Sequence, residues 1–174
     1  MTEVVLVDAS DNPVGTAEKI TAHRPPAPLH RAFSLMLFDE RGRMLLQQRS
    51  QAKYHFRGLW ANSCCGHPEP GETVLLAAKR RCRAELGVDV NDVRAVATVT
   101  YTAVDLESGL MENEFDHILV GSIGAAPIPD ADEISALQWV ESTKLFEELE
   151  RMPDRFAPWL PHVVDALFPR RVLG

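Results

Sequence analysis

One helical stretch, residues 73–86, constrains the fold of this chain more than any other segment. Its sequence, TVLLAAKRRCRAEL, is rich in residues of high helix propensity, and Gly87 just past its end is a typical helix stop. The apolar side chains keep roughly to one face of this helix, at Val74, Leu75, Ala78, Cys82 and Leu86. An amphipathic helix of this kind buries its apolar face against another element, so we expect it to cover a sheet.

Apolar runs separated by turn residues predict the rest of the secondary structure. The predicted strands are residues 3–8, 16–20, 32–38, 44–48, 93–104, 115–122 and 136–140, and two further helices are predicted at about 143–151 and 159–168. The first two strands should form an opening hairpin, and the next two a buried hairpin turning at residues 39–43. The proline-rich segment 22–29 must be a loop. This irregular order predicts an α+β fold, a mixed β-sheet sandwiched between α-helices with an N-terminal β-hairpin extension.

Length and charge narrow the class of protein. A chain of 174 residues with 45% hydrophobic residues suits a single domain, residues 1–174. A net charge of −7 argues against nucleic-acid binding, which draws on clustered Lys and Arg. Two of the 3 cysteines are adjacent, which does not suit a disulfide framework. The N-terminus does not read as a signal peptide, and no apolar run reaches about 18 residues, so we expect a cytoplasmic protein that does not enter the membrane.

The residues around the helix carry a recognisable spacing. From Gly66 the chain runs through five residues to Glu72, then seven to Arg80, with Glu85 and Gly87 following. This spacing resembles the Nudix box, a loop and helix that present carboxylates to a metal bound by a diphosphate. Arg81 and Ala84 stand where that box has two further carboxylates. The resemblance implies a Nudix-like scaffold that lacks hydrolase carboxylates, with Glu85 left to bind Mg²⁺ together with a substrate diphosphate.

Further segments point to one branch of that superfamily. EKITAH, LHRAF, RGLWANSCCGHP, RRCRAELGV and MENE occur in this order. Together they are similar to the type I isopentenyl-diphosphate Δ-isomerases, and the resemblance spans about Thr2 to Trp159. It implies the interconversion of isopentenyl diphosphate and dimethylallyl diphosphate by protonation and deprotonation, a step of isoprenoid biosynthesis. The implied partner is a small allylic or homoallylic diphosphate, and the protein would be a monomer or a homodimer.

The resemblance also implies catalytic residues. Cys65 and Glu114 match the family's acid–base groups on opposite faces of the substrate, Tyr101 matches a proton-relaying tyrosine, and Trp159 matches an aromatic residue that stabilises a carbocation. Each has a structural alternative. A cysteine pair can be buried or belong to a zinc knuckle, although the x₂ spacing and second pair of a knuckle are missing. Tyr101 could be an ordinary strand aromatic. Trp159 could be a core residue, as we expect for Trp60 and Trp139.

A metal centre is implied as well. Glu112 and Glu114 are two residues apart, so on a strand their carboxylates share a face, where a cation would relieve their repulsion. The resemblance adds three imidazoles to this pair, giving the ligand set His23, His30, His67, Glu112 and Glu114. Such an N/O site suits Mn²⁺, Mg²⁺ or Zn²⁺. The other histidines, His55, His117 and His162, are predicted to be surface or loop residues, with His117 facing away from Glu114.

The diphosphate would need cations, and four basic residues match family positions that contact phosphates: Lys19, Arg49, Lys53 and Arg81. Each could equally be an ordinary surface charge, and Arg81 could form a helical i,i+4 salt bridge with Glu85. Two other functions compete with the isomerase. One is a Nudix hydrolase, disfavoured by Arg81 and Ala84. The other is a non-catalytic module that binds metal or diphosphate, which would leave the catalytic set unexplained.

Overall fold

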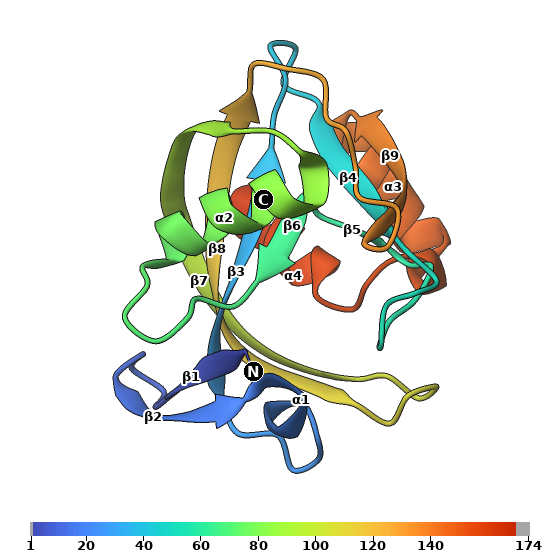
Figure 1. The fold of residues 1–174 in the computed structure, drawn as a ribbon. Coiled ribbons are helices and arrows are strands. Elements are labelled where there is room, and N and C mark those ends of the chain that lie inside the picture. Colours follow the sequence, from blue (N-terminus) through green and yellow to red (C-terminus); the bar gives the residue numbers. More distant parts are fainter. Residues whose placement is uncertain (1, 170–174) are drawn as a thin grey trace.

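The structure is a computed structural model that describes residues 2–169 (Figure 1). Strands and helices interleave irregularly along the chain, as predicted. The elements in order are β1 (Glu3–Val7), β2 (Pro13–Glu18), α1 (Lys19–Ala22), β3 (His30–Leu37), β4 (Met44–Arg49), β5 (Trp60–Ala61), β6 (Cys64–Gly66), α2 (Val74–Leu86), β7 (Val90–Val104), β8 (Met111–Ile123), β9 (Ile134–Val140), α3 (Ser142–Arg151), a 3₁₀ turn (Pro153–Arg155) and α4 (Leu160–Leu167). The α+β class is therefore confirmed.

The larger sheet organises the molecule. Its order is β2-β1-β3-β8-β7, and β6 also pairs with β3. The opening hairpin is confirmed, since β1 and β2 pair antiparallel. It lies with α1 at the lower end of the molecule in Figure 1, below the helix-covered part of the sheet. Strands β3 and β8 run parallel, with His30 opposite Glu114. The mixed sheet thus brings two predicted metal ligands side by side from distant parts of the chain.

The predicted second hairpin is wrong. β3 and β4 belong to different sheets, since β4 pairs with β5 and β9 in a smaller sheet. The predicted turn at residues 39–43 is present, with the N–H of Asp39 donating to the carbonyl of Arg43 at 3.0 Å, but the pairing beyond it stops at an isolated antiparallel bridge from Phe38 to Met44. The physical reason is that β3 already pairs with β8 along its whole length and with β1 and β6 on its other edge. Two short apolar strands joined by a turn do not reveal which partners will occupy their edges.

Helix α2 begins and ends where the sequence predicts. The Thr73 hydroxyl accepts a hydrogen bond from the backbone N–H of Leu76 at 3.3 Å, and Gly87 closes the helix with φ of 64°. One detail of the predicted face is wrong, because Leu75 is 36% exposed while Ala77 is fully buried. The helix lies across the face of the larger sheet (Figure 1). Its buried residues share a hydrophobic cluster with Leu35 and Leu119 of β3 and β8.

A second hydrophobic cluster lies on the other side of the larger sheet. It packs α4 against β7 and includes Trp159, Leu160 and Tyr101. The two clusters leave β3 and β8 buried on both faces, which explains their apolar runs. Within residues 2–169, no helix has the length and apolar character needed to span a membrane.

Candidate active site

Side chains from both sheets and from α2 line one cavity of about 150 Å³. It contains the four predicted catalytic residues, the four predicted phosphate-binding residues, three of the five ligands predicted for the His/Glu metal site, and Glu85. Its lining includes Cys65, Glu114, Tyr101, Trp159, Lys19, Arg49, Lys53, Arg81, His67, Glu112 and Glu85. The two residues predicted to face each other across the substrate, Cys65 and Glu114, therefore open into the same space.

Strand β6 places Cys65. It pairs antiparallel with β3, with Cys65 opposite Ser34. Because side chains alternate along a strand, Cys64 packs into the cluster under α2, whereas Cys65 packs toward Trp159 and the cavity. The two neighbouring cysteines therefore lie on opposite faces of the strand. Within the described chain all three cysteines are free thiols.

Asn62 connects two of the predicted catalytic residues, a role that the sequence analysis missed. Its Oδ1 accepts hydrogen bonds from the thiol of Cys65 and from the indole Nε1 of Trp159, both at 3.0 Å. Its amide Nδ2 donates to the carbonyl oxygens of Leu35 (3.2 Å) and Cys64 (3.1 Å), which fixes the orientation of the amide. Asn62 is fully buried. It stands three residues before Cys65 in the quoted segment, but spacing alone does not reveal a shared acceptor.

The environment of Cys65 keeps its thiol protonated. Burial, together with the nearby Asp116 carboxyl, raises the pKa of Cys65 to about 12. The Ser34 hydroxyl lies 3.8 Å from the Cys65 sulfur and donates to Oδ2 of Asp116 at 2.7 Å. Burial and the charge of Glu114 raise the pKa of Asp116 well above its usual range. At neutral pH the thiol therefore holds a proton that it can give up only to a strong base or a reactive acceptor.

Glu114 receives contacts on both carboxylate oxygens. The Tyr101 hydroxyl donates to Oε2, and Nε2 of His67 lies 2.8 Å from Oε1. Nε2 of His30 lies 3.7 Å from the same Oε1. Burial and the neighbouring Glu112 work to raise the pKa of Glu114, but the two imidazoles more than offset them, and the pKa is lowered. The pKa of the Tyr101 phenol shifts in the opposite direction: burial and the charge of Glu114 raise it well above its usual value.

The predicted metal ligands come together. One ligand atom from each of His23, His30, His67, Glu112 and Glu114 lies within 4.8 Å of all the others. Nδ1 of His23 donates to the carbonyl oxygen of Lys19 (2.6 Å), and Nδ1 of His30 donates to that of Pro28 (2.9 Å). Since a carbonyl can only accept, Nδ1 carries the hydrogen in both rings, and the neutral form of each imidazole has a bare Nε2. Both Nε2 atoms are buried and find no hydrogen-bond partner among residues 2–169.

The free lone pairs of this cluster fit a divalent cation. Oε2 of Glu112 lies 2.9 Å from Nε2 of His23, yet neither atom has a hydrogen-bond partner in the described part of the chain. Burial lowers the pKa of His67 to about 4, which keeps that imidazole neutral. Burial works to lower the pKa of His23 as well, but Glu112 offsets this and the pKa is raised. A proton and a metal ion would therefore compete for the same nitrogen of His23.

His55 is a loop residue, as predicted, but it is not a surface residue. It lies in the segment between β4 and β5, but it is only 4% exposed, and its Nε2 contacts Oε1 of Glu112. No pattern in the sequence points to this contact, because residue 55 is far from residue 112 along the chain and lies outside the predicted strands. The other two histidines differ from it. His162 is exposed and stacks on Tyr101, and His117 faces Asp11 at 2.9 Å, away from Glu114 as predicted.

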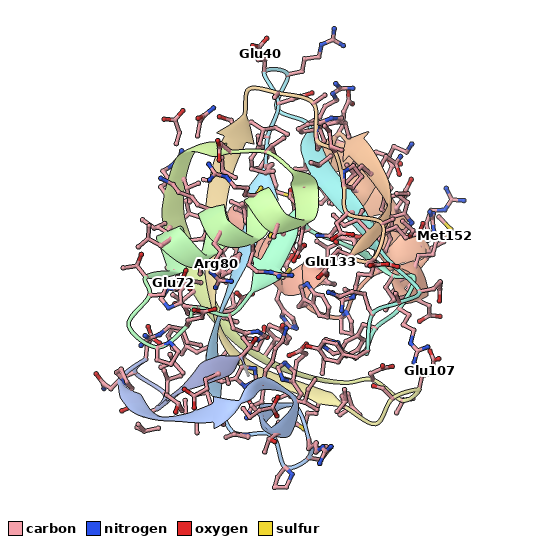
Figure 2. All side chains as sticks on the ribbon, viewed as in Figure 1. Glu40, Glu72, Arg80, Glu107, Glu133 and Met152 are labelled. Carbon is pink, nitrogen blue, oxygen red and sulfur yellow. The ribbon has the colours of Figure 1, made fainter. Side chains whose placement is uncertain are left out.

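The basic residues of the cavity already have acidic partners. Lys53 pairs with Glu133, which also accepts from Arg81 at 3.3 Å. Arg81 pairs with Glu85 as well, so the i,i+4 salt bridge that the sequence left open is present. Oε2 of Glu85 has only a long contact of 3.4 Å with the Gln47 amide, leaving that oxygen accessible to a cation. Figure 2 shows Glu133 in the central part of the molecule.

The other two basic residues lie deeper. Arg49 donates through Nε to the Phe56 carbonyl (2.9 Å) and through its terminal nitrogen to the His55 carbonyl (2.9 Å), and its guanidinium lies 5.3 Å from the centre of the Trp159 ring. It therefore holds the segment between β4 and β5. Lys19 lies over the Tyr54 ring, and burial lowers the pKa of its ammonium group.

Glu72 and Arg80 of the Nudix-like spacing pair with each other; Arg80 also lines the cavity, whereas Glu72 does not. Arg80 donates to both carboxylate oxygens of Glu72, at 2.9 and 2.7 Å. Glu72 also accepts from the backbone N–H of Glu69 at 2.9 Å. Figure 2 shows the two labelled side chains next to one another where the loop meets α2. The pair ties the loop after His67 to the helix, a structural role.

The amino-acid sequence is similar to those of known proteins over most of its length. Residues 28–165 match the NUDIX domain family. The chain is 48% identical over 164 residues to an isopentenyl-diphosphate Delta-isomerase of Streptomyces avermitilis, covering 94% of this chain and 82% of that protein. It is 44% identical over 165 residues to an isopentenyl-diphosphate Delta-isomerase of Halorhodospira halophila, covering 94% of both.

Solved structures share the fold at low sequence identity. A crystal structure from Deinococcus radiodurans superimposes with a TM-score of 0.78 at 21% identity, covering 95% of this chain and 99% of that one. A MutT NUDIX hydrolase of Burkholderia pseudomallei gives a TM-score of 0.60 at 19% identity, covering 80% of this chain and 98% of that one. At these identities the likeness concerns the fold alone, and it confirms the predicted Nudix-like architecture.

Proposed function

Because this chain belongs to the Nudix superfamily and, within it, to the type I isopentenyl-diphosphate Δ-isomerases, we propose that it interconverts isopentenyl diphosphate and dimethylallyl diphosphate, as in isoprenoid biosynthesis. One observation carries the assignment of residues to this reaction. Cys65 and Glu114 line the same cavity, together with Tyr101 and Trp159. An allylic rearrangement needs a proton donor and a proton acceptor that both reach the substrate in one cavity.

The rearrangement adds a proton to one carbon and removes a proton from another. In the ligand-free chain the groups that carry a proton are the Cys65 thiol and the Tyr101 phenol, whereas Glu114 is a carboxylate. One side of the cavity gives a proton to the alkene, and the opposite side takes one from the cation. The substrate neither gains nor loses protons, while one protein group ends protonated and the other deprotonated. The reverse reaction exchanges these roles.

The intermediate is a tertiary carbocation, which water would trap. Trp159 is 3% exposed and Tyr101 is 6% exposed, so the reacting carbons would meet aromatic rings and apolar surface. An aromatic face attracts a cation through its quadrupole without forming a bond to it. The hydrogen bond from Trp159 to Asn62 would hold the indole in place for this role.

The metal ligands proposed are His23, His30, His67, Glu112 and Glu114. Bound there, a divalent cation such as Mn²⁺, Mg²⁺ or Zn²⁺ would polarise Glu114 and, through it, the hydrogen-bonded phenol of Tyr101. The bare Nε2 atoms of His23 and His30 support this set. Without a cation, Oε2 of Glu112 would stay buried with no donor among residues 2–169.

The diphosphate would be held by Lys19, Arg49, Lys53 and Arg81, with Glu85 sharing a Mg²⁺ with it. All five residues line the cavity that contains Cys65. Four basic side chains in one cavity explain how a chain of net charge −7 could bind an anionic substrate. Binding would require Lys53 and Arg81 to exchange Glu133 for phosphate oxygens.

A hydrolase activity is disfavoured by Arg81 and Ala84, which replace carboxylates of the Nudix box, and by Glu72, whose oxygens are held by Arg80. The deciding experiment incubates the purified protein with isopentenyl diphosphate, Mg²⁺ and Mn²⁺. We expect dimethylallyl diphosphate without release of phosphate. Release of phosphate, or unchanged isomerisation by both Cys65→Ala and Glu114→Gln, would refute the proposal.

A further inference from the structure

His55 is held more firmly than an ordinary loop residue. Its ring stacks on Tyr54 with centroids 4.2 Å apart and an interplanar angle of 12°, and Phe56 tilts against it at 5.1 Å. Arg49 donates to the carbonyl oxygens of both His55 and Phe56. The backbone N–H of Phe56 is in turn held by Asp105 at 3.0 Å. The position of the imidazole is therefore set by contacts on several sides.

The partners of His55 also select its tautomer. Nδ1 lies 3.5 Å from a terminal nitrogen of Arg49, and a guanidinium can only donate. Nδ1 is thus the bare nitrogen, and Nε2 carries the hydrogen that points to Oε1 of Glu112. This tautomer is the opposite of that of His23 and His30, whose Nε2 atoms are bare.

The hydrogen bond from His55 occupies one oxygen of Glu112 and leaves the other oxygen free to bind a metal ion. Oε1 accepts from His55, while Oε2 faces Nε2 of His23 at 2.9 Å without a hydrogen-bond partner in residues 2–169. A carboxylate fixed in this way offers one defined oxygen to a cation. Groups that hydrogen-bond to a metal ligand without contacting the metal usually contribute about 10-fold to 100-fold to metal affinity.

We propose that His55 is a positioning residue of the metal centre, which donates its Nε2 hydrogen to Glu112 and so presents the other Glu112 oxygen to the metal. It does not bind the metal itself, because its nitrogen facing the centre carries a hydrogen. The inference rests on the proposed metal site. Since His55 lies two residues from Lys53, it also ties the segment that carries a diphosphate-binding residue to the metal centre.

Two isosteric replacements separate the hydrogen bond from the bulk of the ring. Gln reaches about as far as His and can still donate from its amide, whereas Met fills the same space and cannot donate. Wild type, His55→Gln and His55→Met, each stripped with chelator, are titrated with Mn²⁺, and free Mn²⁺ is followed by electron paramagnetic resonance. His117→Ala, which removes an imidazole that faces Asp11, is the matched control. The melting temperature of each metal-free variant reports folding separately.

We expect His55→Met to bind Mn²⁺ about 10-fold to 100-fold more weakly than wild type, and His55→Gln to stay within about threefold of wild type. His117→Ala should keep wild-type affinity. If both His55 variants bind like wild type, or both are weakened equally, the positioning role is wrong while the metal site stands. If wild type itself does not bind Mn²⁺, the metal site and the inference both fail.

Discussion

The thiol of Cys65 donates a hydrogen bond to Oδ1 of Asn62 at 3.0 Å, and this contact orients the sulfur that lines the cavity. Asn62 accepts from the Trp159 indole through the same oxygen. Two side chains that would act on the substrate in different ways, one by moving a proton and one by stabilising a cation, thus depend on a single buried amide.

Replacing Asn62 with Ala should therefore impair turnover more than substrate binding. We expect kcat to fall by about 10-fold to 100-fold with little change in KM, because the thiol and the indole lose their common anchor. The carbonyl oxygens of Leu35 and Cys64 would lose a donor, which should cost about 1–3 kcal/mol of the free energy of unfolding. Isomerisation kinetics and urea denaturation measure both effects. Asn12→Ala, at the exposed β1–β2 turn, is the control, and equal losses of kcat in the two variants would contradict the assignment.

The thiol of Cys65 should react slowly with alkylating agents in the folded, metal-free protein. Burial raises its pKa to about 12, so at neutral pH its thiolate fraction should lie about 10³-fold below that of an exposed cysteine. Cys64 and Cys82 are also buried, and burial raises both of their pKa values. Iodoacetamide labelling followed by mass spectrometry should show all three modified only after unfolding. Labelling of Cys65 at the same rate before and after urea treatment would disprove this description of its environment.

If Lys53 and Arg81 bind the diphosphate as proposed, Glu133 competes with it for these two cations. Its carboxylate pairs with both, so Glu133→Gln should free Lys53, leave Arg81 paired only with Glu85, and remove a negative charge beside the anionic substrate. We expect KM for isopentenyl diphosphate to fall by about 3-fold to 10-fold, with kcat nearly unchanged. Steady-state kinetics test this, with Glu40→Gln on the distant, exposed turn as the control (Figure 2). A rise in KM would mean that Glu133 helps to arrange the cations instead of occupying them.

The Glu72–Arg80 pair predicts a specific acid sensitivity. The hydrogen bonds from Arg80 lower the pKa of Glu72 in the folded chain below its value of about 4.5 in the unfolded chain. A carboxylate with a lowered pKa stabilises the fold above the unfolded pKa, and this contribution is lost as the pH falls through the folded pKa. Glu72→Gln should thus be less stable than wild type near pH 7, and the difference should shrink toward about pH 3.

Chemical denaturation at several pH values provides the measurement. Glu107→Gln, at the exposed tip between β7 and β8, serves as the control (Figure 2). It removes the same charge as Glu72→Gln, but at a place far from Arg80. A constant difference between Glu72→Gln and wild type at every pH would show that the Arg80 contact does not shift the titration of Glu72.

Local signals account for what the sequence predicted correctly. Thr73 and Gly87 delimit α2 through capping, a property of neighbouring residues. The shared face of Glu112 and Glu114 follows from alternation along β8. Both arguments need only residues close together in the chain. The roles of the catalytic residues came from resemblance to a family, and they stay predictions until variants are measured.

Contacts across the fold explain what the sequence missed. Whether β3 pairs with β4 depends on which strands occupy its edges, and β8 comes from a distant part of the chain. The same holds for His55, whose partner lies 57 positions away in the sequence, and for Asn62, whose second donor lies 97 positions away. A lone histidine in a loop and a buried asparagine give no period or spacing that points to their partners.

The parallel register of β3 and β8 sets His30 opposite Glu114, so the proposed metal centre cannot form before these two strands pair. During synthesis, the first histidines emerge long before the carboxylates that complete the cluster. A chain synthesised only as far as β7 would lack both carboxylates of the proposed site and would bind a metal ion weakly. A slip of one residue between these strands would turn the His30 imidazole and the Glu114 carboxylate to opposite faces. A metal ion bound at the proposed site would therefore stabilise the correct register of the sheet.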